Sequence, residues 1–587
     1  MPKTLPKNNN VLLRPRTREA DEFRHITDFE AGKLIPLYSN PLVLPGDTWQ
    51  FDAKAMIKSI PMTNPIIGSL EFCCYAFFVP WRIIWDECKE FFGENNTTAW
   101  TGSYTKQLPY VTWTGTTTSD TNQPDLAFGH AVGHYLGLPY IDNSSVSIKV
   151  SAAIESRSYA AIWNEYFRNQ NLQGPKTYLV TSGHDIGNTI TYLKGGCFPV
   201  NKKHDVFSGC IPSPQKGTAV NLPFSGLVPV VTNSTSHTPS HPNGSATPIY
   251  WSAPGDASTV VSGTLGSNTN GQGYTVGSAG SFYSKYAPSN LYANIESGVN
   301  LTVQDLRNAA ALQQYYESMA RNGSKYYEMS EAMFGVRPSN ARLDLPEFIG
   351  GFEEPLNITT VTATANGSAG SDNAYLGQEV GKSVTFLNKG LMTYTATEHG
   401  TIMVVGFIRQ GRHMYGNRLD RHFIMSELFE QYFDLFSGTG DVPVYSIEAY
   451  FPANGSSTGL AANSFGSYST VAALQDGLTV LGYQEYGYQY RFGQANRVSG
   501  SFNPYLPSGY SLTNWTMAEK YGSAPSLGSA FIEEDSAAID RAMSLQALDS
   551  QGNVVTSGKY PWWIDFRLDY IATRVMRAHN VPGLTRI

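Results

Sequence analysis

The pattern of apolar and polar residues predicts a half-buried sheet strand near each end of the chain. Every second residue is apolar over 49–57, and the same alternation returns over 562–570. Because successive side chains of a strand point to opposite faces, each segment packs one face on a core and leaves the other in water. More continuously apolar residues at 70–79 and 401–409, and a tyrosine-rich segment at 483–492, predict further strands.

Three segments follow a helical period instead. Residues 81–92 and 303–321 each carry an apolar stripe at spacings of three and four, and 153–169 is expected to form another helix. Thr302 stands where it can cap the N-terminus of the longest helix, and Gly323 follows its end. The helices do not alternate regularly with the strands, which argues against a parallel doubly wound sheet.

The strand patterns cluster at both ends of the chain, with long excursions between them. A jelly roll brings distant strands side by side and tolerates long insertions at its corners. We therefore predict a mainly β fold, a single eight-stranded antiparallel jelly roll with long loop insertions that contain a few helices. The predicted divisions are an extended N-terminal arm over 1–40 and a jelly-roll domain over 41–587, with strands clustered at about 41–80, 390–410, 480–505 and 560–575.

The composition fits a large β protein whose surface meets other subunits. The chain has 587 residues, and its 35 Tyr, 29 Phe and 10 Trp favour strands, which 55 Gly and 33 Pro punctuate. Charged residues make up 15%, below the roughly 25% of an ordinary soluble protein. Low charge indicates surface buried against neighbours. A large secreted β protein has a similar composition and remains an alternative.

The cysteines and the apolar segments indicate which cellular compartment the protein occupies. Five cysteines, two of them adjacent at Cys73 and Cys74, form no disulfide or zinc pattern, so we expect free thiols in a reducing cytosol. The N-terminus MPKTLPKNNN lacks the apolar segment of a secretory signal. The longest apolar segments are too short to cross a bilayer, and we expect no membrane partner.

Five sequence blocks in a fixed order resemble one family. They are 44–48 (LPGDT), 157–173 (RSYAAIWNEYFRNQNLQ), 204–217 (HDVFSGCIPSPQKG), 334–351 (FGVRPSNARLDLPEFIGG) and 581–584 (VPGL). Over nearly the whole chain they resemble the major capsid protein of microviruses, small icosahedral single-stranded-DNA bacteriophages, and most closely the gokushovirus-like branch. The resemblance implies a jelly roll of the viral capsid type with a structural, non-enzymatic role.

The same resemblance implies how the protein assembles and with what. The expected product is a T=1 icosahedral shell of about sixty copies that encloses circular single-stranded DNA. The implied partners are identical subunits, genomic single-stranded DNA, a small basic DNA-packaging protein, other virion or scaffolding proteins and a host surface receptor. The implied location is the virion, assembled in the cytoplasm of the host bacterium.

Residues 217–300 are expected to form a variable surface insertion within the jelly roll. Between Gly217 and Ser284 the only charged residue is Asp256, yet aromatic residues recur. A disordered linker is the alternative, although a pure linker is usually poorer in aromatic residues. The resemblance implies a protrusion at the threefold axes, exposed for host attachment. The candidate attachment residues are Tyr250, Trp251 and Tyr274.

Both ends of the chain are rich in cations and poor in acids, which is suited to phosphate contacts. The candidate nucleic-acid-binding residues are Lys3, Lys7, Arg14, Arg16, Arg18, Arg574, Arg577 and Arg586. Arms that only tie subunits together are an equally good interpretation. With a net charge of −7, about five arm cations per copy cannot neutralise a packaged genome. A separate basic partner is therefore expected.

The search for catalytic chemistry predicts no catalytic residue, no cofactor and no metal site. Glutamates at 353–354 and acids at 533–535 resemble a glycosidase pair only loosely, since adjacent carboxylates usually point apart. His413 and His422 lie among Arg409, Arg412, Arg418 and Arg421 at a spacing that fits no common metal pattern, so surface or interface arginines are expected. The alternative function is a carbohydrate-binding or carbohydrate-cleaving jelly-roll protein.

Overall fold

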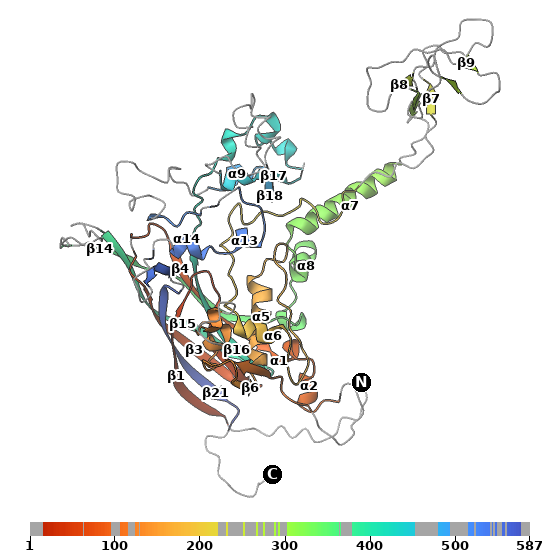
Figure 1. Ribbon diagram of the computed structural model, residues 1–587. Helices are drawn as coiled ribbons and strands as arrows, with labels where there is room; N and C mark the ends of the chain where they lie inside the picture. The colour runs from red at the N-terminus through yellow and green to blue at the C-terminus, as the bar shows by residue number, and fades with distance from the viewer. Residues whose placement is uncertain are drawn as a thin grey trace, which may run out of the picture. The chain divides into compact units, whose positions relative to one another are not determined.

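The chain is described here from a computed structural model (Figure 1). The structure describes residues 16–576, except 63, 96–105, 116–123, 128, 221–229, 233–250, 253–265, 268–273, 276–286, 289–290, 294–301, 363, 365–378, 439, 452–478, 494–514, 520, 522–523, 541–542, 544–545, 549–553 and 558–559. The chain divides into two compact units. Unit one comprises Met1–Pro214 and Ala320–Ile587, and unit two comprises Gln215–Met319.

The first sheet of unit one joins the two ends of the chain. Its strand order is β1 (Thr17–Phe29), β21 (Trp562–Arg574), β3 (Thr48–Ser59), β15 (Glu379–Thr395) and β14 (Ile358–Thr362). Every neighbouring pair is antiparallel. The first and last of these strands in the sequence pair over their full length, as the jelly-roll prediction requires.

The second sheet takes its strands from between those of the first in the sequence. Its order is β13 (Glu347–Pro355), β4 (Leu70–Pro80), β16 (Gly400–Gln410) and β2 (Ile35–Val43), again antiparallel throughout. Successive strands β1, β2, β3 and β4 thus fall in the first, second, first and second sheet. This mainly β arrangement of antiparallel sheets is consistent with a jelly roll.

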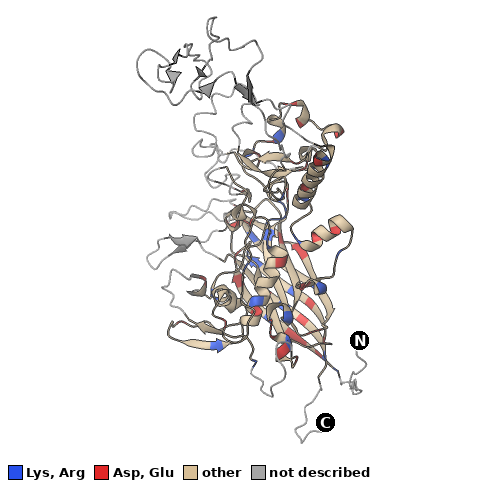
Figure 2. Cartoon of the chain, turned by 90° about the vertical axis from the view of Figure 1, so that its right-hand side faces the viewer, with Lys and Arg blue, Asp and Glu red and all other residues tan. Residues whose placement is uncertain are grey.

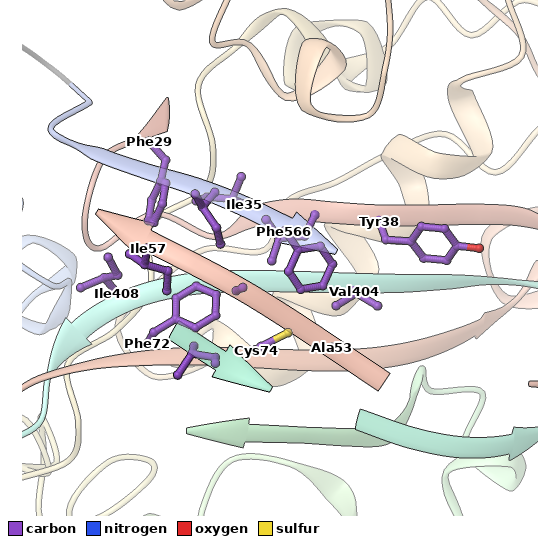
Figure 3. Packing of buried hydrophobic residues seen from close by; sticks show 14 of the residues in the cluster. Phe29, Ile35, Tyr38, Ala53, Ile57, Phe72, Cys74, Val404, Ile408 and Phe566 are labelled. Carbon is purple, nitrogen blue, oxygen red and sulfur yellow. The ribbon is translucent and has the colours of Figure 1, made fainter. Parts of the chain in front are cut away.

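The two sheets share one hydrophobic core. Figure 3 shows Ile57 and Phe566 of the first sheet close to Phe72 and Val404 of the second. The alternation predicted from the sequence is confirmed, because Phe51, Ala53, Ala55 and Ile57 are buried while Asp52 and Lys54 are exposed. The polar positions of β3 and β21 therefore form the face of the first sheet that points away from this core.

The two central strands of the second sheet, β4 and β16, are buried on both faces. Residues Cys73, Phe77 and Val79 of β4, with Met403, Val405 and Phe407 of β16, belong to a second core. This core also contains residues of α1 (Trp81–Ile84) and α5 (Ala153–Ile162), the second of which continues as a π-helix to Phe167. Figure 1 shows α1, α5 and α6 (Asn188–Lys194) gathered beside β16. Burial on both faces explains why β4 and β16 are continuously apolar.

The helix predicted over 81–92 is interrupted. It forms α1 and a separate α2 (Cys88–Phe91), and the backbone of Trp85 between them is extended. The Trp85 side chain is buried, and its indole donates a 2.7 Å hydrogen bond to Ser182. A continuous helix was the wrong prediction because burying this large side chain turns the chain at that point.

The long helix is confirmed as α7 (Val303–Arg321), capped as predicted by a hydrogen bond from the Asp305 amide to the Thr302 hydroxyl. Its apolar stripe is largely exposed, however, including Val303 and Leu306. The apolar pattern therefore predicted the helix correctly but did not predict that its apolar side is exposed in the subunit.

Two predicted boundaries are wrong. The arm over 1–40 ends earlier, since the described residues from Thr17 onwards form β1 and then β2. β1 is mostly exposed, so its apolar pattern is weak and its attachment comes from backbone pairing with β21. The strand over 483–492 is also wrong. β18 (Val480–Gln484) pairs with β17 (Val442–Tyr445) and forms a bridge to Ile211, outside both main sheets, and α11 (Tyr488–Arg491) follows.

The described residues of unit two include three short strand pairs, of which only the backbone is described. They are β7 (Val230–Thr232) with β12 (Leu291–Ala293), β8 (Trp251–Ser252) with β11 (Ala287–Pro288), and β9 (Gly266–Ser267) with β10 (Tyr274–Thr275). Unit two thus includes all of the residues predicted as the insertion, 217–300.

Shorter elements complete the described chain. They are β5 (Val111–Thr114), α3 (Pro124–Ala127), α4 (Val132–Tyr135), β6 (Ser147–Val150), α8 (Tyr326–Phe334), α9 (Ser446–Ala449), α13 (Ser529–Ile532), α14 (Ser536–Asp540), β19 (Gln546–Leu548) and β20 (Val554–Ser557). A small core unites Val444, Leu481, Tyr488 and Phe531 from these later segments. Among the described residues, no helix is both long and apolar enough to cross a membrane.

Candidate functional site

The first sheet brings together candidate cations from opposite ends of the sequence. Thr17 pairs with Arg574 where β1 begins and β21 ends, so Arg16 and Arg18 lie at the same end of the sheet as Arg574. A guanidinium nitrogen of Arg16 lies beside Gly46 in the turn of the LPGDT block. This end of the first sheet is therefore one place where the two cationic termini meet.

Arg574 is occupied by contacts within the chain. Its Nε donates a 3.0 Å hydrogen bond to Oδ2 of the fully buried Asp47, and Nη2 donates to the carbonyl of Leu42. The guanidinium also lies 5.5 Å from the ring centre of Trp49. Asp47 belongs to the LPGDT block, so this block anchors the end of β21. The role of Arg574 in these contacts is structural.

Arg16 and Arg18 have exposed side chains. No ion pair among the described residues includes either of them, in contrast to Arg574. They are therefore the candidate cations, within the described part of the chain, whose charge is most open to a partner. Outside the described residues lie Lys3, Lys7, Arg14, Arg577, Arg586 and Tyr250. Of the attachment candidates Trp251 and Tyr274, only the backbone in β8 and β10 is described.

The face of the first sheet that points away from the core carries a network of cross-strand ion pairs. Arg24 donates two 2.8 Å hydrogen bonds to Asp565, and this contact lowers the pKa of the Asp565 carboxyl. Lys54 lies 2.5 Å from Asp569 on the same face. Figure 2 shows acidic and basic residues interspersed along the sheet strands. Most of the charge on this face is therefore balanced locally.

Two exposed aromatic residues on this face were missed by the sequence search. Trp563 pairs directly with Lys58, and Phe386 pairs with the neighbouring Met56. Trp563, Met56 and Lys58 line a shallow depression together with Ile26. The alternation over 562–570 already placed Trp563 opposite the buried Trp562 and so contained the signal. Exposed aromatic rings beside a lysine are suited to contact with another macromolecule.

The sequence block 157–173 supplies the arginine of a buried ion pair. Arg157 of α5 is fully buried and donates hydrogen bonds of 3.0 and 2.7 Å to Oδ2 of Asp185. It also donates to the carbonyls of Ile84 and Thr181, at 3.2 and 3.0 Å. One side chain thus joins α5 to the last residue of α1 and to the loop before α6. The described contacts of this arginine are structural.

A hollow of about 720 Å³ lies where two of the sequence blocks meet, and Arg168 and His204 are among its lining residues. Three of its lining cations are ion-paired. Lys325 pairs with Glu165 at 3.0 Å, Lys203 with Glu71 at 3.1 Å and Arg409 with Glu353 at 2.8 Å. The Tyr75 hydroxyl in this hollow donates a hydrogen bond to Glu353. Burial raises the pKa of Tyr75 well above its usual range, and Glu353 is already paired with Arg409, so this contact gives no support to catalysis.

The acids considered for glycoside cleavage have partners. Glu353 accepts a hydrogen bond from Arg409, and Glu354 lies 2.6 Å from Lys389. Glu534 lies 2.9 Å from His413, and both side chains are fully buried. Glu534 therefore holds His413 inside unit one. The surface position predicted for the neighbouring arginines is wrong for Arg418 and Arg421, whose side chains are largely buried beside Asp420 and Glu430.

Among the described residues, Glu71, Cys73 and Glu353 form a group with the spacing of a metal site. Two features oppose a cation there. Arg409 and Lys203 already pair with both carboxylates. Burial raises the pKa of the Cys73 thiol to about 12, so the thiol stays protonated at neutral pH. These residues are better explained as an ion-pair network.

The family model for "Capsid protein (F protein)" matches residues 14–584, nearly the whole chain. The chain belongs to this capsid protein family. The match begins in front of β1 and ends after β21, so it includes the sheet that joins both ends. The predicted microvirus capsid resemblance, in the gokushovirus-like branch, is confirmed.

Three relatives are capsid proteins. This capsid-family chain is 29% identical to capsid protein VP1 of Spiroplasma virus 4, over 99% of this chain and 97% of the relative. It is 27% identical to capsid protein VP1 of Bdellovibrio phage phiMH2K, over 94% and 93% of the two chains. For capsid protein VP1 of Chlamydia phage 1 the identity is 26%, over 96% and 94%. Family membership supports a structural role over the carbohydrate-binding alternative.

The buried Arg157–Asp185 pair leads to a stability prediction for the subunit. Replacing Arg157 by Met leaves Asp185 buried and unpaired, and we expect the free energy of unfolding to fall by about 3–5 kcal/mol. Adding Asp185→Leu removes the unpaired buried carboxylate and should recover part of the lost free energy of unfolding. Urea unfolding of the purified subunit measures both effects. The exposed Arg18→Met is the control, and a loss below about 1 kcal/mol for Arg157→Met contradicts the assignment.

Proposed function

We propose that this protein is the major capsid protein of a microvirus and assembles into a T=1 icosahedral shell around circular single-stranded DNA. The strand order is the observation that supports this most strongly. The sheet orders β1-β21-β3-β15 and β2-β16-β4-β13 support an assignment of these strands as the eight of a capsid-type jelly roll, with β14 added at one edge. Membership of the capsid protein family supports the same conclusion.

The function of such a subunit is association with identical copies. Contacts between different faces of identical subunits close into a shell when the rotations between them are whole fractions of a turn. Each stable contact buries at least about 1,000 Å² in total, and a shell subunit needs several. A charged fraction of only 15% and many exposed aromatic residues suit a surface that neighbours cover. We place the protein in the virion, assembled in the host cytoplasm.

DNA contact is proposed for the cationic ends of the chain. Arg16 and Arg18 support it through their exposed side chains, with Lys3, Lys7, Arg14, Arg577 and Arg586 as further candidates. Arg574 is omitted because Asp47 holds it. Since the chain carries a net charge of −7, a small basic packaging protein is proposed as a partner. Other virion or scaffolding proteins complete the proposed assembly.

Host attachment is proposed for residues 217–300. The separate compactness of unit two supports a device that can vary without disturbing the jelly roll. The segment is rich in polar residues and contains aromatic residues such as Tyr250, Trp251 and Tyr274, which suit contact with a receptor.

The shell itself gives the direct test of this function. Purified protein, screened over salt, pH and concentration, should form closed particles of megadalton mass. Static light scattering measures the mass, and negative-stain micrographs show closure. A chain that stays monomeric in every condition contradicts the proposal.

The arm gives a prediction about cargo. Changing Arg14, Arg16 and Arg18 to Gln should lower encapsidated DNA by more than it lowers shell yield, because three phosphate contacts per subunit are lost. The ratio of absorbance at 260 and 280 nm in gradient-purified particles measures it. Arg337, Arg342 and Lys382 are also exposed, and changing these three to Gln is the control. If the DNA content of each shell is unchanged while the yield of shells falls, the arm connects subunits and does not bind DNA.

The insertion gives a prediction about attachment. Replacing residues 224–284 by a short glycine linker should leave shells that assemble but no longer bind host cells. Sedimentation measures assembly, and depletion of particles by host cells measures attachment. If the deletion prevents folding or assembly, the insertion is an element of the shell instead.

A further inference from the structure

One short segment of unit one exposes an unusual concentration of large apolar side chains. Within residues 423–435 the side chain of Leu435 is 88% exposed and that of Leu428 is 70% exposed. We call the exposed set the 423–435 patch, and it consists of Phe423, Leu428, Phe429, Tyr432, Phe433 and Leu435. Single exposed apolar residues are ordinary, but a cluster of this density marks an interaction site.

The backbone beneath the patch is held by a buried ionic network. Arg421 donates to Glu430 at 3.0 Å and lies 3.3 Å from Glu448 of α9. Glu430 in turn accepts the amides of Ser426 and Glu427 at 2.6 and 2.9 Å. The Tyr488 hydroxyl donates a 2.6 Å bond to the other oxygen of Glu448. The side chains of Arg421 and Glu430 therefore point into unit one, and their contacts anchor the backbone that carries the exposed apolar side chains.

Side chains next to β18 fix the second half of the patch. The hydroxyl of Tyr486 donates to the carbonyl of Gln431 at 2.6 Å and accepts the amide of Phe433 at 3.2 Å. Gln489 donates a 3.0 Å bond to the carbonyl of Glu430. Figure 1 shows α9, β17 and β18 grouped in this part of unit one. A segment held at this many points presents its apolar side chains ready for contact, which lowers the entropic cost of binding.

The patch is large enough to form most of one side of a stable contact. Large aromatic or aliphatic side chains each offer roughly 150–250 Å², of which about half or more is exposed here. The six together expose on the order of 600 Å², against about 800 Å² per partner in a standard interface. The patch also matches the composition of interface cores, which are rich in Phe, Tyr and other apolar residues.

The charges around the patch exclude nucleic acid as its occupant. Between residues 419 and 436 the only Lys or Arg is Arg421, which is already paired with Glu430 and Glu448. The same residues include Asp420, Glu427 and Asp434. Binding of a phosphate backbone requires unpaired cations, and the excess of acidic over basic residues in this segment repels phosphates. An anionic lipid surface is disfavoured for the same reason.

We propose that a second copy of this chain covers the 423–435 patch, as one of the contacts between subunits of the shell. This inference rests on the proposed function, because a shell places an identical neighbour against every copy.

The first experiment changes two leucines of the patch to Gln, Leu428→Gln with Leu435→Gln. Both side chains are exposed in the subunit, so circular dichroism and the melting temperature should stay unchanged. The subunit concentration needed for assembly should rise at least about tenfold, since two apolar groups are lost from every contact. The matched control is Leu42→Gln with Ile186→Gln, two exposed apolar side chains outside the patch, which should assemble as the native chain does.

A second measurement follows one position directly. Leu435→Cys introduces a thiol whose reaction with a maleimide should be fast in free subunits and slow in shells. The native cysteines give little background, because Cys73, Cys74, Cys88 and Cys210 are buried and Cys197 is partly buried. This labelling decides the question even if the double variant fails to fold.

The outcomes separate the inference from the function on which it rests. Shells that form normally from the double variant, together with an introduced thiol that stays reactive in shells of Leu435→Cys, overturn the inference and leave the shell function standing. An introduced thiol that is unreactive already in free subunits shows that the chain's own residues cover the patch, which also overturns the inference. A native chain that forms no shell in any condition overturns the proposed function and the inference together.

Discussion

The pairing of the first strand with the last is the constraint on which the rest of the structure depends. β21 lies between β1 and β3 and forms hydrogen-bonded ladders with both, so residues more than 500 positions apart become neighbours. The LPGDT turn strengthens this closure, because the buried Asp47 receives Arg574 at the end of β21. Long excursions between the strands are tolerated because loop-closure entropy grows only slowly with loop length.

The two sheets use their faces differently, and this difference determines which surfaces are available for contact. The two central strands of the second sheet are buried on one side by the first sheet and on the other by α1 and α5. The first sheet leaves its far side open, with balanced ion pairs and two exposed aromatic rings. Further exposed apolar residues lie on the later segments around α9 and β18. The surfaces suited to neighbours therefore lie outside the second sheet.

The sequence predicted the strands whose apolar and polar residues follow a clear local pattern. β3 and β21 were found because one face of each is buried, and β4 and β16 because both faces are. β1 was missed because few of its side chains are buried, so no apolar pattern marks it. The strand prediction for 483–492 was wrong because its tyrosines do not alternate between the two faces of a strand. Tyr486 and Tyr488 instead donate hydrogen bonds from their hydroxyls to neighbouring segments. The Arg574–Asp47 contact joins residues 527 positions apart, a pairing that no local pattern contains.

A disulfide across the joined strands tests the central claim most directly. Arg24 of β1 lies opposite Arg567 of β21, and in the same row Lys54 and then Asn388 follow on β3 and β15. Opposed residues of antiparallel strands have Cα atoms about 4.5–5.5 Å apart, within the reach of a disulfide, whereas three strands of spacing amount to about 14 Å. Under mild oxidation, Arg24→Cys with Arg567→Cys should form an internal disulfide visible on a non-reducing gel, and Arg24→Cys with Asn388→Cys should form none. Failure of the first pair to close, or equal closure of both pairs, contradicts the account.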